Sequence, residues 1–273
     1  MLSYVTVCDG EEYLDYAKAL IASIDQAHKD DARLLVMCAN ISPARMDEMD
    51  EITKRVGFVR YATVAGVADK SKVDYAVAAS HKMRAWVAAI DHLRDGLGDS
   101  IFLDVDTIVL RNPERFFAAD FDIGFTYKDT EVQGFHWPLN SGVVLAKLNS
   151  RARGFLGIWR DRTDELIADS GKAAALRKLW GGEDQSSLGS MLGTRLREDY
   201  AAGLNVCGAR LQGFRCSYLN EVSCAPITDA LHIIHYKGKW RDVLAKRQWR
   251  PSRPKEKCLE MYELWWKYRN MWG

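Results

Sequence analysis

SIFLDVDTIVL (residues 100–110) joins a buried strand to two acids at its carboxyl end. The apolar run 101–103 is followed at once by Asp104 and, after one more residue, by Asp106. Consecutive apolar residues are typical of a strand that is covered on both faces, as in a parallel sheet. Such sheets bind ligands at the carboxyl ends of their strands. The two acids are therefore predicted to lie at a ligand site of an α/β sheet.

Asp104 and Asp106 have the spacing of a cation site. In extended backbone, residues i and i+2 project to the same side, so the carboxylates on either side of Val105 converge. Paired carboxylates bind a hard cation, which can also bridge phosphate oxygens. The motif is short, and its alternative interpretation is a strand end whose acids face water or cap a turn.

Upstream of this stretch, strand and helix patterns alternate. β-Rich runs lie at 3–8, 33–39 and 58–64. Helical patterns of apolar residues follow them, from Tyr13, from Ser42-Pro43 and from Ser80. Consecutive βα units build a parallel sheet with helices on its faces. The predicted fold class is therefore α/β, with a mostly parallel central sheet flanked by helices.

The downstream half continues the sheet and ends in a helix. Strands are predicted over 122–128 and 139–147, and helices over 151–168, 183–192 and 255–271. No internal repeat or low-complexity linker divides 1–240, which is therefore expected to form one domain. Residues 241–273 are expected to form a basic and aromatic C-terminal extension that ends in the last helix.

Composition narrows the function classes. The 273 residues are 48% hydrophobic and 27% charged, which is enough apolar material for the core of an ordinary enzyme. The net charge of +1 argues against a nucleic-acid partner, because neutralising phosphates needs an excess of Lys and Arg. The first residues lack the pattern of a secretory signal, and the cysteines form no C-x-x-C pair. We therefore expect a cytoplasmic protein with reduced thiols.

Three later segments carry polar groups of the kind that a phosphosugar site needs: LNSGVVL (139–145), WGGEDQSSL (180–188) and HIIHYKGKWR (232–241). Together with the start VTVCDGEEY and the helix SHKMRAW, they occur in the order of the motifs of glycosyltransferase family 8. The chain resembles this family, which includes glycogenin and the bacterial lipopolysaccharide galactosyl- and glucosyltransferases. The resemblance spans nearly all of residues 3–241, and it depends on the joint order of motifs that are each weak alone.

The resemblance implies a GT-A fold, which is Rossmann-like, over the catalytic domain 1–240. It implies a nucleotide-diphosphate sugar as the donor, with UDP-glucose and UDP-galactose favoured. A saccharide or a lipid-linked sugar would be the acceptor. The anomeric configuration of the transferred hexose would be retained.

A metal site is implied as well. Asp104 and Asp106 match the D-x-D acids of the family, and His235 matches its late His-x-x-Gly element. Two carboxylates and a neutral imidazole suit Mn²⁺ and accept Mg²⁺. Without the other motifs, His235 on the strand LHIIHY would be interpreted as a core histidine.

Further residues match the donor-binding motifs. The resemblance implies nucleotide-sugar contacts for Val7, Asp9, Gly10, Tyr13, Lys82, Asp104, Val105, Asn140, Ser141, Gly238, Lys239 and Arg241. Asp184 and Gln185 are implied as catalytic residues on the reacting face of the sugar. Two positions depart from the family: Glu183 is an extra acid that puts the register of Asp184 in doubt, and Arg241 replaces a lysine. Tyr13 has a plain alternative as a core aromatic, and Lys82 as a solvated helix lysine.

The C-terminal segment is strongly basic. From Lys237 onward there are eleven Lys or Arg against four Asp or Glu, interleaved with tryptophans. Basic and aromatic residues together suit an anionic membrane surface, so 237–257 is expected to meet a membrane or the acceptor. This would make the protein peripheral at the inner face of a membrane. The last helix has an apolar face and an acidic stripe, which favour packing on the domain.

Other function classes fit the sequence less well. A phosphatase of the haloacid-dehalogenase type also has an apolar strand followed by D-x-D, but there the motif opens the chain. A sugar-nucleotide-forming nucleotidyltransferase needs a glycine-rich basic loop after the first strand, where this chain has the acidic CDGEEY. The remaining alternative is a catalytically silent sugar-nucleotide-binding or scaffolding protein of the same fold.

Overall fold

A central sheet organises the computed structural model, which describes residues 1–28, 31–63, 80–92, 98–128, 139–193, 197–221, 227–236, 244 and 256–272. Its strands lie in the order β3 (Val59–Thr63), β2 (Ala32–Ala39), β1 (Leu2–Asp9), β4 (Asp99–Asp104), β7 (Leu139–Lys147), β6 (Ile123–Tyr127), β9 (Ala209–Arg215) and β8 (Leu204–Val206). The pairs β3–β2, β2–β1, β1–β4 and β6–β9 are parallel. The pairs that involve β7, and the pair β8–β9, are antiparallel. The prediction of a mostly parallel sheet is confirmed.

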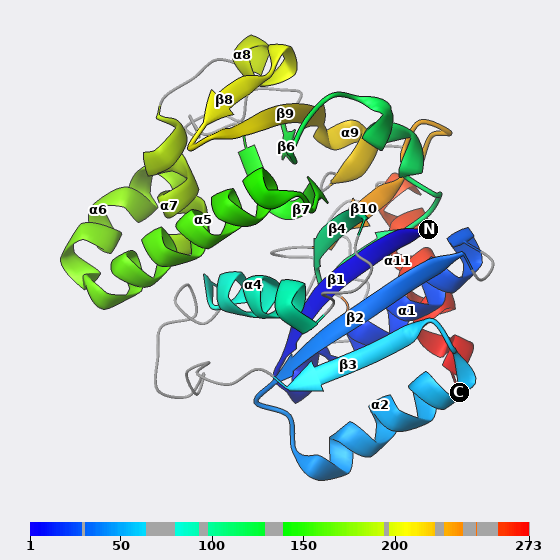
Figure 1. Cartoon of the computed structure of the whole chain (residues 1–273). Helices are drawn as coiled ribbons and strands as arrows, with labels where there is room; N and C mark the ends of the chain where they lie inside the picture. The colour runs from blue at the N-terminus through cyan, green and yellow to red at the C-terminus, as the bar shows by residue number, and fades with distance from the viewer. Residues whose placement is uncertain are drawn as a thin grey trace.

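Helices cover both faces of this sheet (Figure 1). One face packs against α1 (Leu14–His28), α2 (Pro43–Arg55) and α11 (Glu256–Arg269). The other packs against α4 (Lys82–His92), α5 (Ser150–Ala168) and α7 (Glu183–Leu192). Strand β1 serves both layers because its side chains alternate: Tyr4 lies in the first apolar cluster and Val5 in the second.

The remaining elements are short or peripheral. Those not foreseen from the sequence are η1 (Glu11–Tyr13), η3 (Glu114–Ala118), α6 (Ser170–Trp180), α8 (Arg197–Ala202), α9 (Cys216–Leu219), β8 and β9. Helix α6 begins at the cap Asp169, whose side chain accepts a hydrogen bond from the amide of Lys172. It ends at Gly181, which has a φ of 101° that favours glycine.

A second, two-stranded sheet lies beside the end of β4. Its strands β5 (Thr107–Val109) and β10 (Ile233–His235) are antiparallel, and Thr107 faces His235 in the register. Val105 and Asp106 form the turn between β4 and β5, so the expectation of continuous extended backbone through the D-x-D motif is wrong. The acids approach each other across a turn.

Asp122 joins three elements on the β6 side of the sheet. Its buried carboxylate accepts hydrogen bonds from the side chain of Asn149, from the Arg151 guanidinium and from the backbone amide of Arg210. The Arg151 guanidinium is the main cause that lowers the pKa of this carboxyl to about 2. The charge of Asp122 therefore ties β6, the start of α5 and β9 together.

The C-terminal helix packs on the domain. Trp265 of α11 is buried, and its ring centroid lies 5.5 Å from that of Tyr16 in α1. Trp272, in the final turn η4 (Asn270–Trp272), donates its indole N–H to the carbonyl of Lys18. Among the described residues, no helix combines the length and the apolar character needed to cross a bilayer. The division into 1–240 and 241–273 stays a prediction.

Candidate active site

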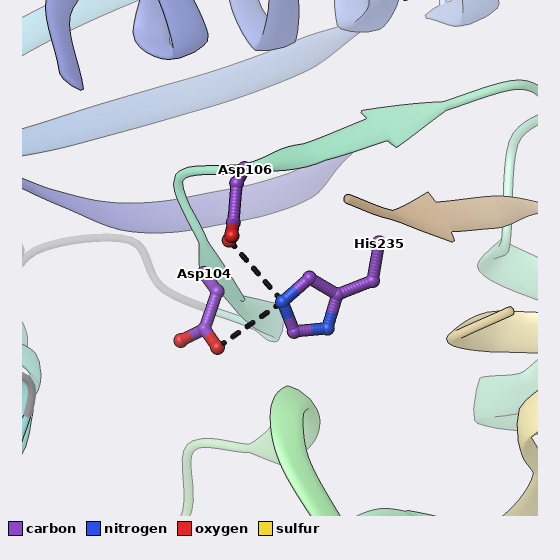
Figure 2. A group of neighbouring side chains, drawn as sticks. All are labelled: Asp104, Asp106 and His235. Carbon is purple, nitrogen blue, oxygen red and sulfur yellow. Dashed lines mark ion pairs between the residues drawn. The ribbon is translucent and has the colours of Figure 1, made fainter. Parts of the chain in front are cut away.

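Two aspartates and a histidine meet where β4, the following turn and β10 come together (Figure 2). Nε2 of His235 lies 3.5 Å from Oδ2 of Asp104 and 3.2 Å from Oδ1 of Asp106. One potential ligand atom from each residue lies within 4.8 Å of the others. His235 and Asp106 are buried, and Asp104 is partly exposed. The structure thus brings together the three residues that the sequence assigned to a metal.

Backbone pairing fixes this approach. The amide of Tyr236 donates to the carbonyl of Asp106 at 2.7 Å, which extends the pairing of β10 with β5. The hydroxyl of Thr107 donates to the carbonyl of Asp104 at 2.8 Å and closes the turn. The main chain therefore positions the imidazole opposite the two acids.

Gly142 leaves room for the imidazole. A Cβ at this position would lie 2.3 Å from Cε1 of His235 and 3.1 Å from Oδ2 of Asp104. The absence of a side chain at Gly142 lets the ring of His235 approach the backbone of β7 closely. Any larger residue there must displace that ring or the acid.

The three residues fit a divalent cation. Within the described part of the chain, Nε2 of His235 is buried without a hydrogen-bond partner. It faces carboxylate oxygens that also require positive charge, because buried anionic groups need a counter-charge. Oxygen and imidazole ligands of this kind suit Mn²⁺ and are acceptable to Mg²⁺.

Lys82, at the start of α4, connects the two acidic parts of the site. Its Nζ lies 2.9 Å from Oδ1 of Asp104, 3.1 Å from Oδ2 of Asp184 and 3.2 Å from Oγ of Ser141. Burial by itself would lower the pKa of Lys82, but the two facing carboxylates outweigh it and raise the pKa. Lys82 is therefore a charged residue held inside the site, and its interpretation as a solvated helix lysine is wrong.

Asp184 lies in the first turn of α7, where a helix N-terminus favours an acid. Its carboxylate accepts hydrogen bonds from Ser141 at 2.8 Å and from Ser80 at 3.3 Å, and its backbone amide donates to Oγ of Ser80. The neighbouring Glu183 is fully buried and is paired with Arg177 of α6. The acid that faces Lys82 and Ser141 is thus Asp184, and Glu183 serves a separate ion pair.

Gln185 and Asn140 lie next to this group. The amide of Gln185 donates to the carbonyl of Leu139 at 2.8 Å. Oδ1 of Asn140 accepts from the amide of Gly142, whereas its Nδ2 is buried and has no partner among the described residues. A buried donor without an acceptor costs free energy of folding. Nδ2 of Asn140 is therefore suited to donate a hydrogen bond to an oxygen of a ligand.

The N-terminal residues lie at the carboxyl end of β1, beside β4. Val7 is opposite Asp104 in the register of these strands. Asp9 accepts a hydrogen bond from Asn40, and Gly10 has a φ of 102°. Tyr13 is half-buried, with its ring centroid 5.8 Å from that of Tyr16, so the ring belongs in part to the core.

Three predicted donor contacts lie outside the described residues: Gly238, Lys239 and Arg241. Val105 is described and lies in the turn between the two aspartates, with its side chain in the core.

Sequence reasoning missed three polar residues that support the site. Asn220 follows α9 and is fully buried, with Oδ1 2.9 Å from Nδ1 of His235. Thr126 of β6 contacts Asn220, and the hydroxyl of Ser80 contacts Asp184. Asn220 and Thr126 lie outside the quoted motifs, and Ser80 is recognisable only as the start of the helix SHKMRAW. The contacts Thr126–Asn220 and Ser80–Asp184 each join segments about a hundred residues apart in the chain, so they form only after folding.

Comparisons with known proteins identify the family and the fold. A family model described as nucleotide-diphospho-sugar transferase matches residues 94–247. No curated protein matches the chain. The structure of the glycosyltransferase GlyE from Streptococcus pneumoniae TIGR4 is similar over 100% of this chain and 62% of its own, with 13% identity and a TM-score of 0.62. For the galactosyltransferase LgtC, solved with donor and acceptor sugar analogues, the coverage is 93% and 98%, the identity 15% and the TM-score 0.54. At these identities the structural likeness establishes the fold.

Proposed function

Because this chain belongs to the nucleotide-diphospho-sugar transferase family, we propose that it moves a hexose from UDP-glucose or UDP-galactose to a saccharide or lipid-linked acceptor. The observation that carries this proposal is that a possible cation site and a charged pair share one residue, Asp104. The cluster of Asp104, Asp106 and His235 adjoins the Lys82–Asp184 pair through Asp104. A site for a diphosphate-bound cation is thereby continuous with a site for the sugar.

Asp104, Asp106 and His235 would hold Mn²⁺ or Mg²⁺. When bound, this cation supplies Lewis-acid stabilisation of the negative charge that grows on the departing diphosphate. Lys82 offers a fixed positive charge 2.9 Å from Asp104, so it keeps that acid in one orientation and adds to the positive potential near the diphosphate. These residues stabilise charge without reorganising during the reaction.

The sugar would lie against Asn140, Ser141, Asp184 and Gln185. The unpartnered Nδ2 of Asn140 is a donor for a sugar hydroxyl. Ser141 and Lys82 hold the carboxylate of Asp184 in place, so this acid presents a fixed negative charge to the ring as positive charge develops there. In the proposed retaining transfer, Gln185 or Asp184 would lie nearest the opposite face of the ring, and the leaving phosphate would be the base for the acceptor.

The nucleotide would lie at the carboxyl end of β1. Val7, Asp9, Gly10 and Tyr13 are its proposed contacts, and Val7 is beside Asp104 in the sheet. Gly238, Lys239 and Arg241 are proposed to contact the diphosphate. An arginine there would grip phosphate oxygens as a two-pronged donor.

The basic segment 237–257 is proposed to contact the acceptor or an anionic membrane, at the cytoplasmic face where a lipid-linked acceptor would be reached. The catalytic domain would be 1–240, with 241–273 as its extension.

A nucleotide-release assay tests the proposal. The protein is incubated with UDP-glucose, UDP-galactose and GDP-sugars, each with Mn²⁺, with Mg²⁺ and with a chelator, and the release of nucleoside diphosphate is measured. Release from a UDP-sugar that depends on the cation is expected. Binding of the donor with no release under any condition would favour the catalytically silent alternative.

A further inference from the structure

Behind His235 lies a buried amide that faces the other nitrogen of the ring. Oδ1 of Asn220 is 2.9 Å from Nδ1 of His235, and Asn220 is fully buried. The ring therefore lies between Asn220 on one side and the carboxylates of Asp104 and Asp106 on the other. How the amide is oriented decides which ring nitrogen carries the proton.

The orientation of the amide follows from Thr126. The hydroxyl of Thr126 lies 3.0 Å from the carbonyl oxygen of Asn140, which can only accept, so the hydroxyl donates there. Its lone pair is left to accept from Nδ2 of Asn220, at 2.7 Å. With Nδ2 used in this way, Oδ1 of Asn220 must be the atom that faces His235.

The proton of His235 is consequently fixed on Nδ1. An amide oxygen accepts hydrogen bonds, so Nδ1 of His235 donates to Asn220 and Nε2 presents its lone pair to the two aspartates. Histidines that bind metals in proteins almost always donate their second N–H to such a partner, which sets both the tautomer and the ring orientation.

A strand irregularity brings Thr126 into this position. The pairing of β6 with β7 shifts register between Phe125 and Thr126, so that Thr126 is opposite Asn140. Irregularities of this kind re-aim side chains and are common next to functional sites. The same hydroxyl thus connects a cation ligand, through Asn220, to the backbone of a sugar-binding residue.

We propose that Asn220, oriented by Thr126, is a positioning residue that holds His235 as an Nε2 ligand of the divalent cation. The inference rests on the proposed function, because it assigns a role toward the same cation. A merely structural role for Asn220 would affect the stability of the fold and leave the affinity for the cation unchanged.

Binding of Mn²⁺ alone separates these roles. Free Mn²⁺ is quantified by electron paramagnetic resonance during titration of the wild type and of Asn220→Ala, Asn220→Asp, Thr126→Val and Thr126→Ser. Asn149→Ala is the control, because it also removes the side-chain hydrogen bonds of an asparagine, here an exposed one at the cap of α5. Thermal unfolding of each protein verifies that it is folded.

We expect the dissociation constant for Mn²⁺ to rise about 10- to 100-fold in Asn220→Ala, the usual effect of losing such a support. Asn220→Asp retains an acceptor for Nδ1–H but loses the donor to Thr126, so it is expected to bind Mn²⁺ more tightly than Asn220→Ala does. Thr126→Val keeps the shape but not the hydroxyl, so it should weaken binding, whereas Thr126→Ser should not. Asn149→Ala should lower stability and leave the affinity as it is.

Two results would overturn the inference in distinguishable ways. If the wild type binds Mn²⁺ and releases nucleotide while Asn220→Ala and Thr126→Val bind Mn²⁺ equally well, Asn220 has no positioning role and the proposed function stands. If the wild type neither binds Mn²⁺ nor releases nucleotide, the proposed function fails and the inference fails with it. Should Asn220→Ala not fold, the Thr126 pair decides by itself.

Discussion

At the scale of single residues, the charged side chains of the site contact one another directly. Asp104 contacts both His235 and Lys82, each with a different carboxylate oxygen. Asp106 contacts His235 and is almost fully buried. The two acids therefore have unequal surroundings, although the motif shows them as equivalent.

Asp106→Asn tests the most buried acid of the cluster. Replacing a negative oxygen by a neutral amide removes charge that the cation needs, while the volume of the side chain stays nearly the same. We expect turnover at saturating Mn²⁺ to fall by at least about 100-fold, the scale for losing one key electrostatic group. Donor hydrolysis by the purified variant measures this, with the exposed Asp161→Asn as a control. Activity close to that of the wild type would remove Asp106 from the site.

Gly142→Ala tests the contact between the sheet and the imidazole. The added methyl would overlap the ring of His235, and overpacking of this kind costs about 1–3 kcal/mol. We expect weaker Mn²⁺ binding together with lower stability. Gly154→Ala is the control, because a Cβ there meets open space in helix α5 and should be neutral or slightly stabilising. Equal Mn²⁺ affinities of the two variants would contradict the contact.

Prediction from the sequence identified the charged residues of the site but not the polar residues that orient them. The D-x-D acids and His235 belong to recognisable motifs, and the structure places them together. Asn220 acts on His235, which is fifteen residues away, and Ser80 acts on Asp184, which is more than a hundred residues away. Such contacts produce no recognisable pattern in the sequence, because only the folded backbone brings the partners within reach.

At the scale of elements, the secondary structure was predicted best where burial was strongest. Strand β7 and helix α7 have the predicted bounds, 139–147 and 183–192. Helix α6 was missed because Ala173 is its one buried residue, so it lacks an apolar stripe and depends on its caps. Strand β9 was missed because Gly213 occupies a buried position and Phe214 the next one, so that only Ala209 and Leu211 give an apolar alternation.

The carboxylate of Asp122 makes the junction of β6, α5 and β9 sensitive to acid. Its folded pKa of about 2 lies below the ordinary value of 3.8, so its stabilising effect is present above pH 4 and is lost as the pH falls toward 2. A shift of this size corresponds to about 1–2 kcal/mol after allowance for solvent screening of the exposed Arg151.

Urea unfolding between pH 2.5 and 6 checks this expectation. Asp122→Asn should be less stable than the wild type at pH 6, and the difference should shrink as the pH is lowered. Asp161→Asn, which changes an exposed acid, should show no such trend. A difference that stays constant across the range would mean that the charge of Asp122 is not what holds the junction.

At the scale of the whole molecule, the last helix is part of the folded domain. Trp265 and Met261 of α11 lie in the same apolar cluster as β1 and α1. The hydroxyl of Tyr236, the residue after His235, donates to the carbonyl of Met261. The C-terminal helix is therefore coupled both to the core and to the strand that carries the imidazole.

Trp265→Ala tests this coupling. Truncation of a buried tryptophan costs about 3–5 kcal/mol, and the whole chain is expected to unfold in one transition at a lower urea concentration. Leu259→Ala, on the exposed side of the same helix, should change stability by less than about 0.5 kcal/mol. Two separate transitions in the variant, detected by circular dichroism and tryptophan fluorescence, would show that the helix folds independently.

The pairing of β5 with β10 has a consequence during synthesis. Asp104 ends β4, Asp106 lies in the turn before β5, and His235 lies on β10, which pairs with β5. More than a hundred residues nevertheless separate the two acids from His235 along the polypeptide. A nascent chain that has emerged from the ribosome only as far as α9 contains both acids and lacks their nitrogen partner. A cation that needs all three ligands would therefore have no complete site during the early steps of folding, because only the tertiary structure brings the ligands together.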